Sequence, residues 1–145
     1  MKKLVHVLMV DDDEGDIQLT KECLLEAKIR IDLSVVNDGE QCMEFLRRQG
    51  KYSDAQLPDV ILLDLNMPKK DGRQTLEEIR ADKVLKAIPV VILTTSDADQ
   101  DIVESYTKGA NSYVKKPVDF EQYRKIVSEI SDFWFEIVAL PKVNK

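Results

Sequence analysis

Residues 60–68 read Val-Ile-Leu-Leu-Asp-Leu-Asn-Met-Pro, an apolar run that ends in an acid. Four branched apolar residues in succession are typical of a strand that is buried on both faces of a sheet. Asp64 follows the last of them, where the strand reaches the edge of the sheet. A half-desolvated carboxylate in such a place is paired, bound to a metal or used in chemistry. This stretch therefore predicts a buried strand with a chemically active site at its end.

Polar side chains of complementary chemistry follow three other apolar runs in the same way. They are Asp11 and Asp12 after residues 4–10, Thr94 at the end of residues 89–94, and Lys116 after residues 111–115. The carboxyl ends of parallel strands meet at one edge of a sheet, which is where ligands bind in α/β folds. We therefore expect carboxylates, a hydroxyl and an ammonium to lie together, a set suited to phosphoryl transfer.

Five apolar runs alternate with five amphipathic stretches along the whole chain. The runs are about 4–10, 31–36, 59–64, 89–94 and 111–115, and the helical patterns begin near residues 14, 39, 72, 97 and 117. In the fourth helical pattern, Ile102, Val103 and Tyr106 are expected to face inward. Strict alternation predicts an α/β fold, a doubly wound parallel sheet of five strands with helices on both faces, (βα)5. The 145 residues fit one domain, 1–145.

Composition and charge exclude several classes of protein. The net charge of −6, without a basic patch, argues against nucleic-acid binding. No run approaches 18 apolar residues and the start of the chain lacks a signal-peptide pattern, so we expect no membrane association and a cytoplasmic location. Cys23 and Cys42 match no metal or redox spacing and are expected to be small buried or half-buried thiols.

The residues expected at this edge of the sheet, which we call the rim, suit the formation of an aspartyl phosphate on Asp64. Two anions must approach one another in that reaction, so a cation is required, and Asp11, Asp12 and Asp64 would offer hard oxygens to Mg²⁺ (or Mn²⁺). The main-chain carbonyl of Asn66 could complete the coordination. Lys116 could neutralise one phosphoryl oxygen and the hydroxyl of Thr94 could donate to another.

Together these motifs resemble the receiver domains of two-component response regulators, over about residues 4–137. The matching residues are Asp11-Asp12, Asp64 with the following Met67-Pro68 and Asp71-Gly72, Thr94, and Lys116-Pro117. The resemblance implies a flavodoxin-like strand order of 2-1-3-4-5. It implies that a sensor histidine kinase phosphorylates Asp64, that Asp12, Asp64 and the Asn66 carbonyl bind Mg²⁺, and that Asp11 reaches the ion through water.

Further properties follow only from that resemblance. Tyr113 would be the switch aromatic, which turns inward as Thr94 moves toward the phosphate and so alters the surface that an unknown downstream protein reads. The Lys116–Pro117 bond would be cis. Phosphorylation and dephosphorylation would be self-catalysed on the protein itself, with no turnover of a separate substrate, so the chain would not be an enzyme.

The end of the chain carries a second signal. Phe120, Tyr123, Val127, Ile130 and Trp134 follow helical spacing and predict one buried stripe. Three consecutive aromatics then span about 200° of the helix surface, so one face cannot cover them all. We expect the last helix and tail, about 119–145, to form a homodimer contact. The contact residues would be Phe133, Trp134, Phe135, Ile137 and Leu140. This ending also resembles that of stand-alone response regulators that serve phytochrome-type kinases.

Three other kinds of protein share part of this pattern. A haloacid dehalogenase-type phosphatase also uses an aspartate nucleophile, but it needs a second acid two residues later, where this chain has Asn66. A flavodoxin-like cofactor binder would need a turn that cradles phosphate after the first strand, and the acids there repel phosphate. A non-phosphorylated pseudo-receiver that signals by binding alone would be expected to have lost some of the matching positions, and all are present.

Overall fold

A single sheet of five parallel strands, in the order β2-β1-β3-β4-β5, forms the centre of the computed structural model. The strands are β1 (Leu4–Val10), β2 (Arg30–Val36), β3 (Val60–Leu63), β4 (Val90–Thr94) and β5 (Ser112–Lys115). This order confirms the predicted doubly wound topology. The structure describes residues 4–143; residues 1–3 and 144–145, which the predicted domain includes, lie outside the described residues.

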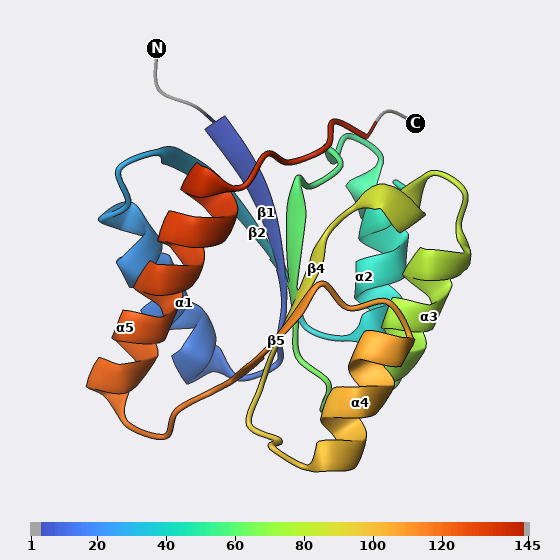
Figure 1. Ribbon diagram of the computed structural model, residues 1–145. Coiled ribbons are helices and arrows are strands. Elements are labelled where there is room, and N and C mark those ends of the chain that lie inside the picture. The colour runs from blue at the N-terminus through green and yellow to red at the C-terminus, as the bar shows by residue number, and fades with distance from the viewer. Residues whose placement is uncertain (1–3, 144–145) are drawn as a thin grey trace.

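Helices cover both faces of the sheet (Figure 1). One face carries α1 (Glu14–Leu25) and α5 (Phe120–Ile130), and the other carries α2 (Gly39–Leu46), α3 (Gly72–Ala81) and α4 (Asp99–Thr107). Two short 3₁₀ turns, Gly50–Tyr52 and Leu85–Ala87, complete the connections. No helix among residues 4–143 combines the length and the apolar character that crossing a membrane requires.

Four of the helices begin at an aspartate that caps them. Asp13, Asp38, Asp71 and Asp119 each accept a hydrogen bond from the backbone N–H three residues later. Such caps satisfy N–H groups that have no partner within the helix. They explain why each helix begins directly after the turn that leaves the preceding strand. By contrast, the residue that precedes α4 is Ala98, whose side chain cannot cap the helix.

Two apolar clusters hold the helices to the sheet. The first joins alternate residues of the strands to α2 and α3, with Leu46, Leu76 and Ile79 completely buried. The second joins the other face to α1 and α5, through Leu24, Tyr123 and Val127 among others. In α4, however, only Ser105 is buried, and Val103 and Tyr106 are 65% and 49% exposed. The prediction that Val103 and Tyr106 face inward was therefore wrong, because this helix lies shallowly on the sheet.

The last helix continues as a π-helical segment, Ser131–Ile137. Its wider turn closes with a hydrogen bond from the Val138 N–H to the Phe133 carbonyl, five residues back. The fully buried position that follows Ile130 and Ser131 is therefore Phe135, while Trp134, which helical spacing placed in the stripe, is only partly buried. The predicted stripe was also wrong at Phe120, which is 74% exposed at the start of α5.

The π-helical turn divides the predicted dimer residues into different environments. Phe135 lies in the core, while Trp134 and Leu140 pack partly buried against the second apolar cluster. Phe133 and Ile137 remain 52% and 71% exposed. Phe135 therefore cannot contact a partner without leaving the core.

The tail after α5 crosses the amino-terminal ends of the strands (Figure 1). Lys142 donates from its Nζ to Asp59 Oδ1 at 3.3 Å, and Val143 packs against the first apolar cluster. The described part of the tail therefore packs on its own chain.

Candidate functional site

The predicted rim residues come together at the carboxyl edge of the sheet. Asp11 follows β1, Asp64 follows β3, Thr94 ends β4 and Lys116 follows β5. Strand pairing places these ends side by side, since β1 pairs with β3, β3 with β4, and β4 with β5. The edge is thus built by the topology, from residues up to 105 positions apart in the chain.

Lys116 is the centre of this site. Its ammonium is 3% exposed and lies 2.7 Å from Asp11 Oδ2, 2.9 Å from Asp16 Oδ2 and 3.1 Å from Asp64 Oδ2. Burial alone would lower the pKa of Lys116, but the attraction and hydrogen bonds of the carboxylates outweigh it and raise the pKa. The side chain is therefore a fixed positive charge beside Asp64.

Sequence reasoning missed Asp16. It lies in the first turn of α1, three residues after the capping Asp13, and its backbone N–H donates to the Asp13 side chain at 2.9 Å. The cap at Asp13 signals where α1 begins, but the contact of Asp16 with Lys116 depends on the tertiary placement of α1.

The carboxylates are oriented by their own backbone. Asp11 Oδ1 accepts the Asp13 N–H at 2.9 Å, and Asp64 Oδ1 accepts the Asn66 N–H at 3.2 Å. Asp11 and Asp64 are buried, whereas Asp12 is exposed. Burial raises the pKa of Asp11 to about 6, although Lys116 acts in the opposite direction. The site thus holds several acids close together, and burial disfavours the charged form of Asp11.

A divalent cation fits this arrangement. Oxygen atoms of Asp11, Asp12 and Asp64 all lie within 4.8 Å of one another, close enough to share one ion. Carboxylate oxygens are the ligands that hard cations take, and an ion there would offset the repulsion among the acids. Asn66, whose main-chain carbonyl the resemblance assigns to the ion, lies two residues after Asp64 and is exposed.

Gly72 allows α3 to begin beside Asp64. A Cβ at this position would meet the Asp64 carbonyl oxygen at 2.2 Å and Leu65 Cα at 2.7 Å, and the Gly72 N–H donates to the Leu65 carbonyl at 2.9 Å. Any larger residue would push the backbone of Asp64 away. The Asp71-Gly72 pair therefore positions Asp64 as well as starting the helix.

Thr94 and Tyr113 lie on the α4 side of the edge. The Thr94 hydroxyl is buried and, within residues 4–143, has no hydrogen-bond partner. A buried hydroxyl of this kind favours a ligand that can accept its proton. Tyr113 is half-buried, and its hydroxyl donates to the Ser96 carbonyl at 2.9 Å, in the loop that follows Thr94.

The predicted cis bond before Pro117 is wrong: the described residues contain no cis peptide bond. The trans form is favoured by about 0.5–1 kcal/mol for a bond to proline, so proline alone does not impose cis.

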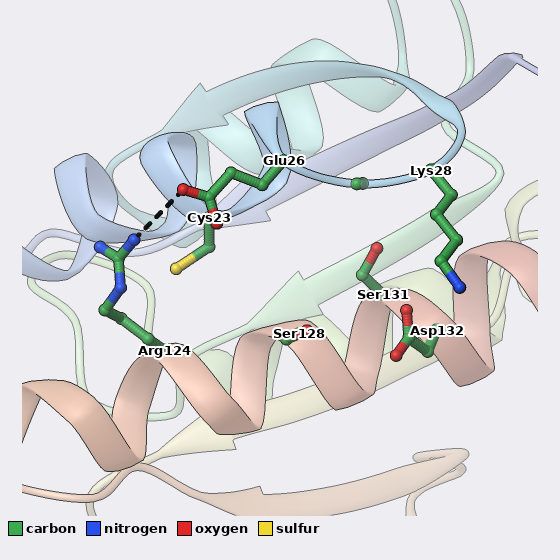
Figure 2. Close-up of a pocket in the computed structure, with 8 residues that line it drawn as sticks. Cys23, Glu26, Lys28, Arg124, Ser128, Ser131 and Asp132 are labelled. Carbon is green, nitrogen blue, oxygen red and sulfur yellow. Dashed lines mark ion pairs between the residues drawn. The ribbon is translucent and has the colours of Figure 1, made fainter.

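A pocket between α1 and α5 lies apart from this site (Figure 2). Cys23 of α1 and Glu26, which follows the last residue of that helix, lie opposite Arg124, Ser128 and Asp132. Arg124 forms an ion pair with Glu26 at 3.6 Å. Burial raises the pKa of the Cys23 thiol, and Cys42 is completely buried. The prediction of two small buried or half-buried thiols is confirmed.

Comparison with known proteins gives a consistent result. Residues 7–128 match the model of the response regulator receiver domain. The chain is 43% identical to response regulator Rcp1 of Synechocystis sp. over 135 residues, which cover 93% of this chain and 92% of that protein.

Two solved structures are similar over almost the whole chain. The phosphorylated cyanobacterial phytochrome response regulator RcpA has a TM-score of 0.93 at 41% identity, covering 97% of this chain and 100% of that one. The Mn²⁺-bound form of Rcp1 has a TM-score of 0.92 at 42% identity, covering 95% and 99%.

Proposed function

This chain belongs to the response regulator receiver domains, and from that premise we propose that it accepts a phosphoryl group from a histidine kinase on Asp64. The observation that supports this most directly is the position of the Asp64 carboxylate. It lies 3.1 Å from the Lys116 ammonium and shares a 4.8 Å cluster with Asp11 and Asp12.

In the proposed reaction, a carboxylate oxygen of Asp64 forms a bond to phosphorus while the bond from phosphorus to the kinase histidine nitrogen breaks. The leaving imidazole keeps the electron pair. Lys116 stabilises the negative charge on one phosphoryl oxygen, and the unpartnered Thr94 hydroxyl donates to another. Asp64, Lys116 and Thr94 lie at neighbouring strand ends, so they are already close to one another before a phosphoryl group arrives.

We assign Mg²⁺ to the cluster, with Mn²⁺ as an alternative ion. Asp12, Asp64 and the Asn66 carbonyl would hold it directly, and Asp11 through water. The ion would supply positive charge that allows the two anions to approach. Rcp1, which is 42% identical, has been solved with Mn²⁺ bound.

The test is incubation with a small phosphodonor such as acetyl phosphate, with and without Mg²⁺, read by intact mass. We expect one added phosphate on the wild type, and none on Asp64→Asn or without the metal. Equal labelling of Asp64→Asn would overturn the assignment. We expect no sustained turnover of a phosphomonoester, because Asn66 cannot act as the second acid of a phosphatase.

Thr94 and Tyr113 are proposed as the switch. Attraction of the Thr94 hydroxyl toward the phosphoryl group would disturb the loop whose Ser96 carbonyl holds the Tyr113 hydroxyl. The affected surface, next to α4, would then regulate a downstream protein. Tyr113→Phe should leave phosphorylation intact and alter the chemical shifts that phosphorylation induces in α4.

A phytochrome-type kinase is the donor that we propose. Support comes from the similarity to RcpA, a cyanobacterial phytochrome response regulator. Phosphotransfer from a phosphorylated phytochrome-type kinase should be at least tenfold faster than from an unrelated histidine kinase at equal concentration. Equal rates would remove the assignment. The cytoplasmic location expected from the sequence stays a prediction.

A homodimer through the end of the last helix is also proposed. Exposed Phe133 and Ile137 support it, and Trp134 packs edge-on against Phe133 with ring centroids 5.8 Å apart. Light scattering coupled to size exclusion should give a dimer for the wild type and a monomer for Ile137→Glu. Phe120→Glu, at the other exposed end of the helix, should remain dimeric. A monomeric wild type would remove the proposal.

A further inference from the structure

Asp16 is a carboxylate that no part of the proposed reaction uses, yet it contacts the reactive lysine. Its Oδ2 lies 2.9 Å from Lys116 Nζ, closer than the Asp64 oxygen at 3.1 Å. It arises from the first turn of α1 rather than from a strand end, and its side chain is 28% exposed against 3% for Lys116. Its contact with Lys116 is therefore the one nearest to solvent.

The ammonium of Lys116 is already engaged by three carboxylates: it donates hydrogen bonds to Asp11 and Asp64 and forms an ion pair with Asp16. A lysine ammonium has three N–H groups. Within the described residues Lys116 has three carboxylate partners, Asp11, Asp16 and Asp64. A phosphoryl group on Asp64 adds acceptors with strong negative charge, which compete with the existing partners for the ammonium of Lys116.

Breaking the contact with Asp16 costs less free energy than breaking the contact with Asp11. Asp11 is 2% exposed and would lose its only direct cationic partner among residues 4–143 while it stays buried, whereas Asp16 is 28% exposed and can return to water. The Asp64 oxygen cannot withdraw, because the phosphoryl group is attached to that residue. Release also leaves the helix intact, because Asp13 and not Asp16 provides the cap of α1.

We propose that Asp16 is a positioning residue that competes with the phosphoryl group for Lys116 and thereby opposes the phosphorylated state. This inference rests on the proposed function of Asp64. Asp16 satisfies Lys116 while the site is unphosphorylated, and it is displaced when the phosphoryl group arrives. An ion pair with a partly exposed carboxylate changes an equilibrium constant by a factor of up to about five.

The test measures binding of beryllofluoride, which mimics a phosphoryl group on a carboxylate, by calorimetry at saturating Mg²⁺. Asp16→Asn should bind it about three- to fivefold more tightly than the wild type. Glu14→Gln is the matched control, since it removes an exposed acid from the same first turn and should change the affinity by less than about twofold. Asp16→Glu restores a carboxylate and should return the affinity toward that of the wild type.

The outcomes separate the two proposals. A wild type that does not bind beryllofluoride would overturn the proposed function, and this inference with it. If the wild type binds, equal or weaker binding by Asp16→Asn would overturn the competition alone. Equal tightening by Glu14→Gln would also overturn it, because general charge and not the contact with Lys116 would then be responsible. Thermal unfolding of each variant shows that the compared proteins are folded.

Discussion

The helices α5 and α4 lie on opposite faces of the same sheet, and they are attached to it in different ways. Helix α5 buries Tyr123, Val127 and Ile130, and its π-helical continuation buries Phe135. Helix α4 buries only Ser105 and exposes most of Val103. Apolar burial therefore holds one helix, while the other depends on polar contacts around its ends.

Those polar contacts are specific. Asp101 in the first turn of α4 accepts from Arg73 of α3 at 2.8 Å and from Ser96 at 2.7 Å. Lys108 at its end lies 2.8 Å from Glu77. Breaking such contacts requires less free energy than exposing buried apolar side chains. The face next to Thr94 and Tyr113 can therefore rearrange without unfolding the core. The difference suggests that the α1–α5 side acts as a scaffold and the α4 side as the responsive part.

Phe135→Ala should give the largest effect. Removing a fully buried phenylalanine leaves a cavity and should destabilise the protein by about 3–5 kcal/mol in urea unfolding. The matched control is Phe133→Ala, two residues earlier and 52% exposed, which should cost less than about 1 kcal/mol. Similar losses for the two variants would contradict the assignment of Phe135 to the core.

Arg80→Ala should be next in size, and it tests the polar attachment of the α4 side. Arg80 donates to the carbonyls of Gly109, Lys86 and Ile88 and to Asn111 Oδ1, at 2.8–3.1 Å, so it ties α3 to the segment after α4. Its loss leaves the part-buried carbonyls of Gly109 and Ile88 without this donor and should cost about 2–3 kcal/mol in urea unfolding.

The control for Arg80 is on the other face. Arg124 of α5 is 39% exposed and lies 3.7 Å from Glu22 and 3.6 Å from Glu26. Arg124→Ala should therefore cost less than about 1 kcal/mol. If Arg124→Ala lost as much stability as Arg80→Ala, polar contacts would be equally important on both faces. The contrast between an apolar attachment of α5 and a polar attachment of α4 would then be wrong.

Much of the fold and of the rim could be read from the sequence, because both depend on backbone topology. Buried runs alternate with capped helices, so the parallel sheet follows from the pattern, and the meeting of Asp11, Asp64 and Lys116 follows from parallel strands in the order that the resemblance implied. Asp13 and Asp71 signal helix starts in the same local way.

The parts that could not be predicted depend on how far each helix turns or tilts. Helical spacing placed Trp134 in the apolar stripe and left Phe135 for a dimer contact, but the π-helical segment buries Phe135 and leaves Trp134 only partly buried. Spacing also gave α4 an apolar face, but it carries no information on the depth at which a helix lies. Asp16 was overlooked because its role depends on the approach of α1 to Lys116, which is a tertiary contact.

The pH dependence of stability should show the cost of burial on the α1–α5 side. The pKa of Asp11 is raised to about 6 from 3.8, so the folded state binds this proton more tightly than the unfolded chain. Its contribution to stability is therefore present at low pH and is lost as pH rises through about 6. In metal-free protein the loss should be roughly 1–3 kcal/mol between pH 4.5 and 7.5.

Asp11→Asn isolates this effect, because the amide does not titrate. The variant should lose less stability than the wild type over the same pH range, as followed by urea unfolding. Asp97→Asn is the control on the α4 side: Lys115 lowers the pKa of that exposed acid, so the variant should not flatten the profile. An unchanged profile for Asp11→Asn would show that Asp11 is not the group responsible.

The smallest predicted effect compares two tyrosine hydroxyls, one on each side. Tyr123 of α5 is 2% exposed, and its hydroxyl lies 3.0 Å from Thr20 Oγ1, which donates to the Asp16 carbonyl at 2.8 Å. Tyr123→Phe removes one buried hydrogen bond and should cost about 1 kcal/mol. Tyr106 of α4 is 49% exposed and accepts the Tyr113 N–H at 3.1 Å, so water can replace its hydroxyl. Tyr106→Phe should cost less than about 0.5 kcal/mol in the same urea titration. A greater loss for Tyr106→Phe would mean that α4 is held as firmly as α5, which would reverse the assignment of scaffold and responsive side.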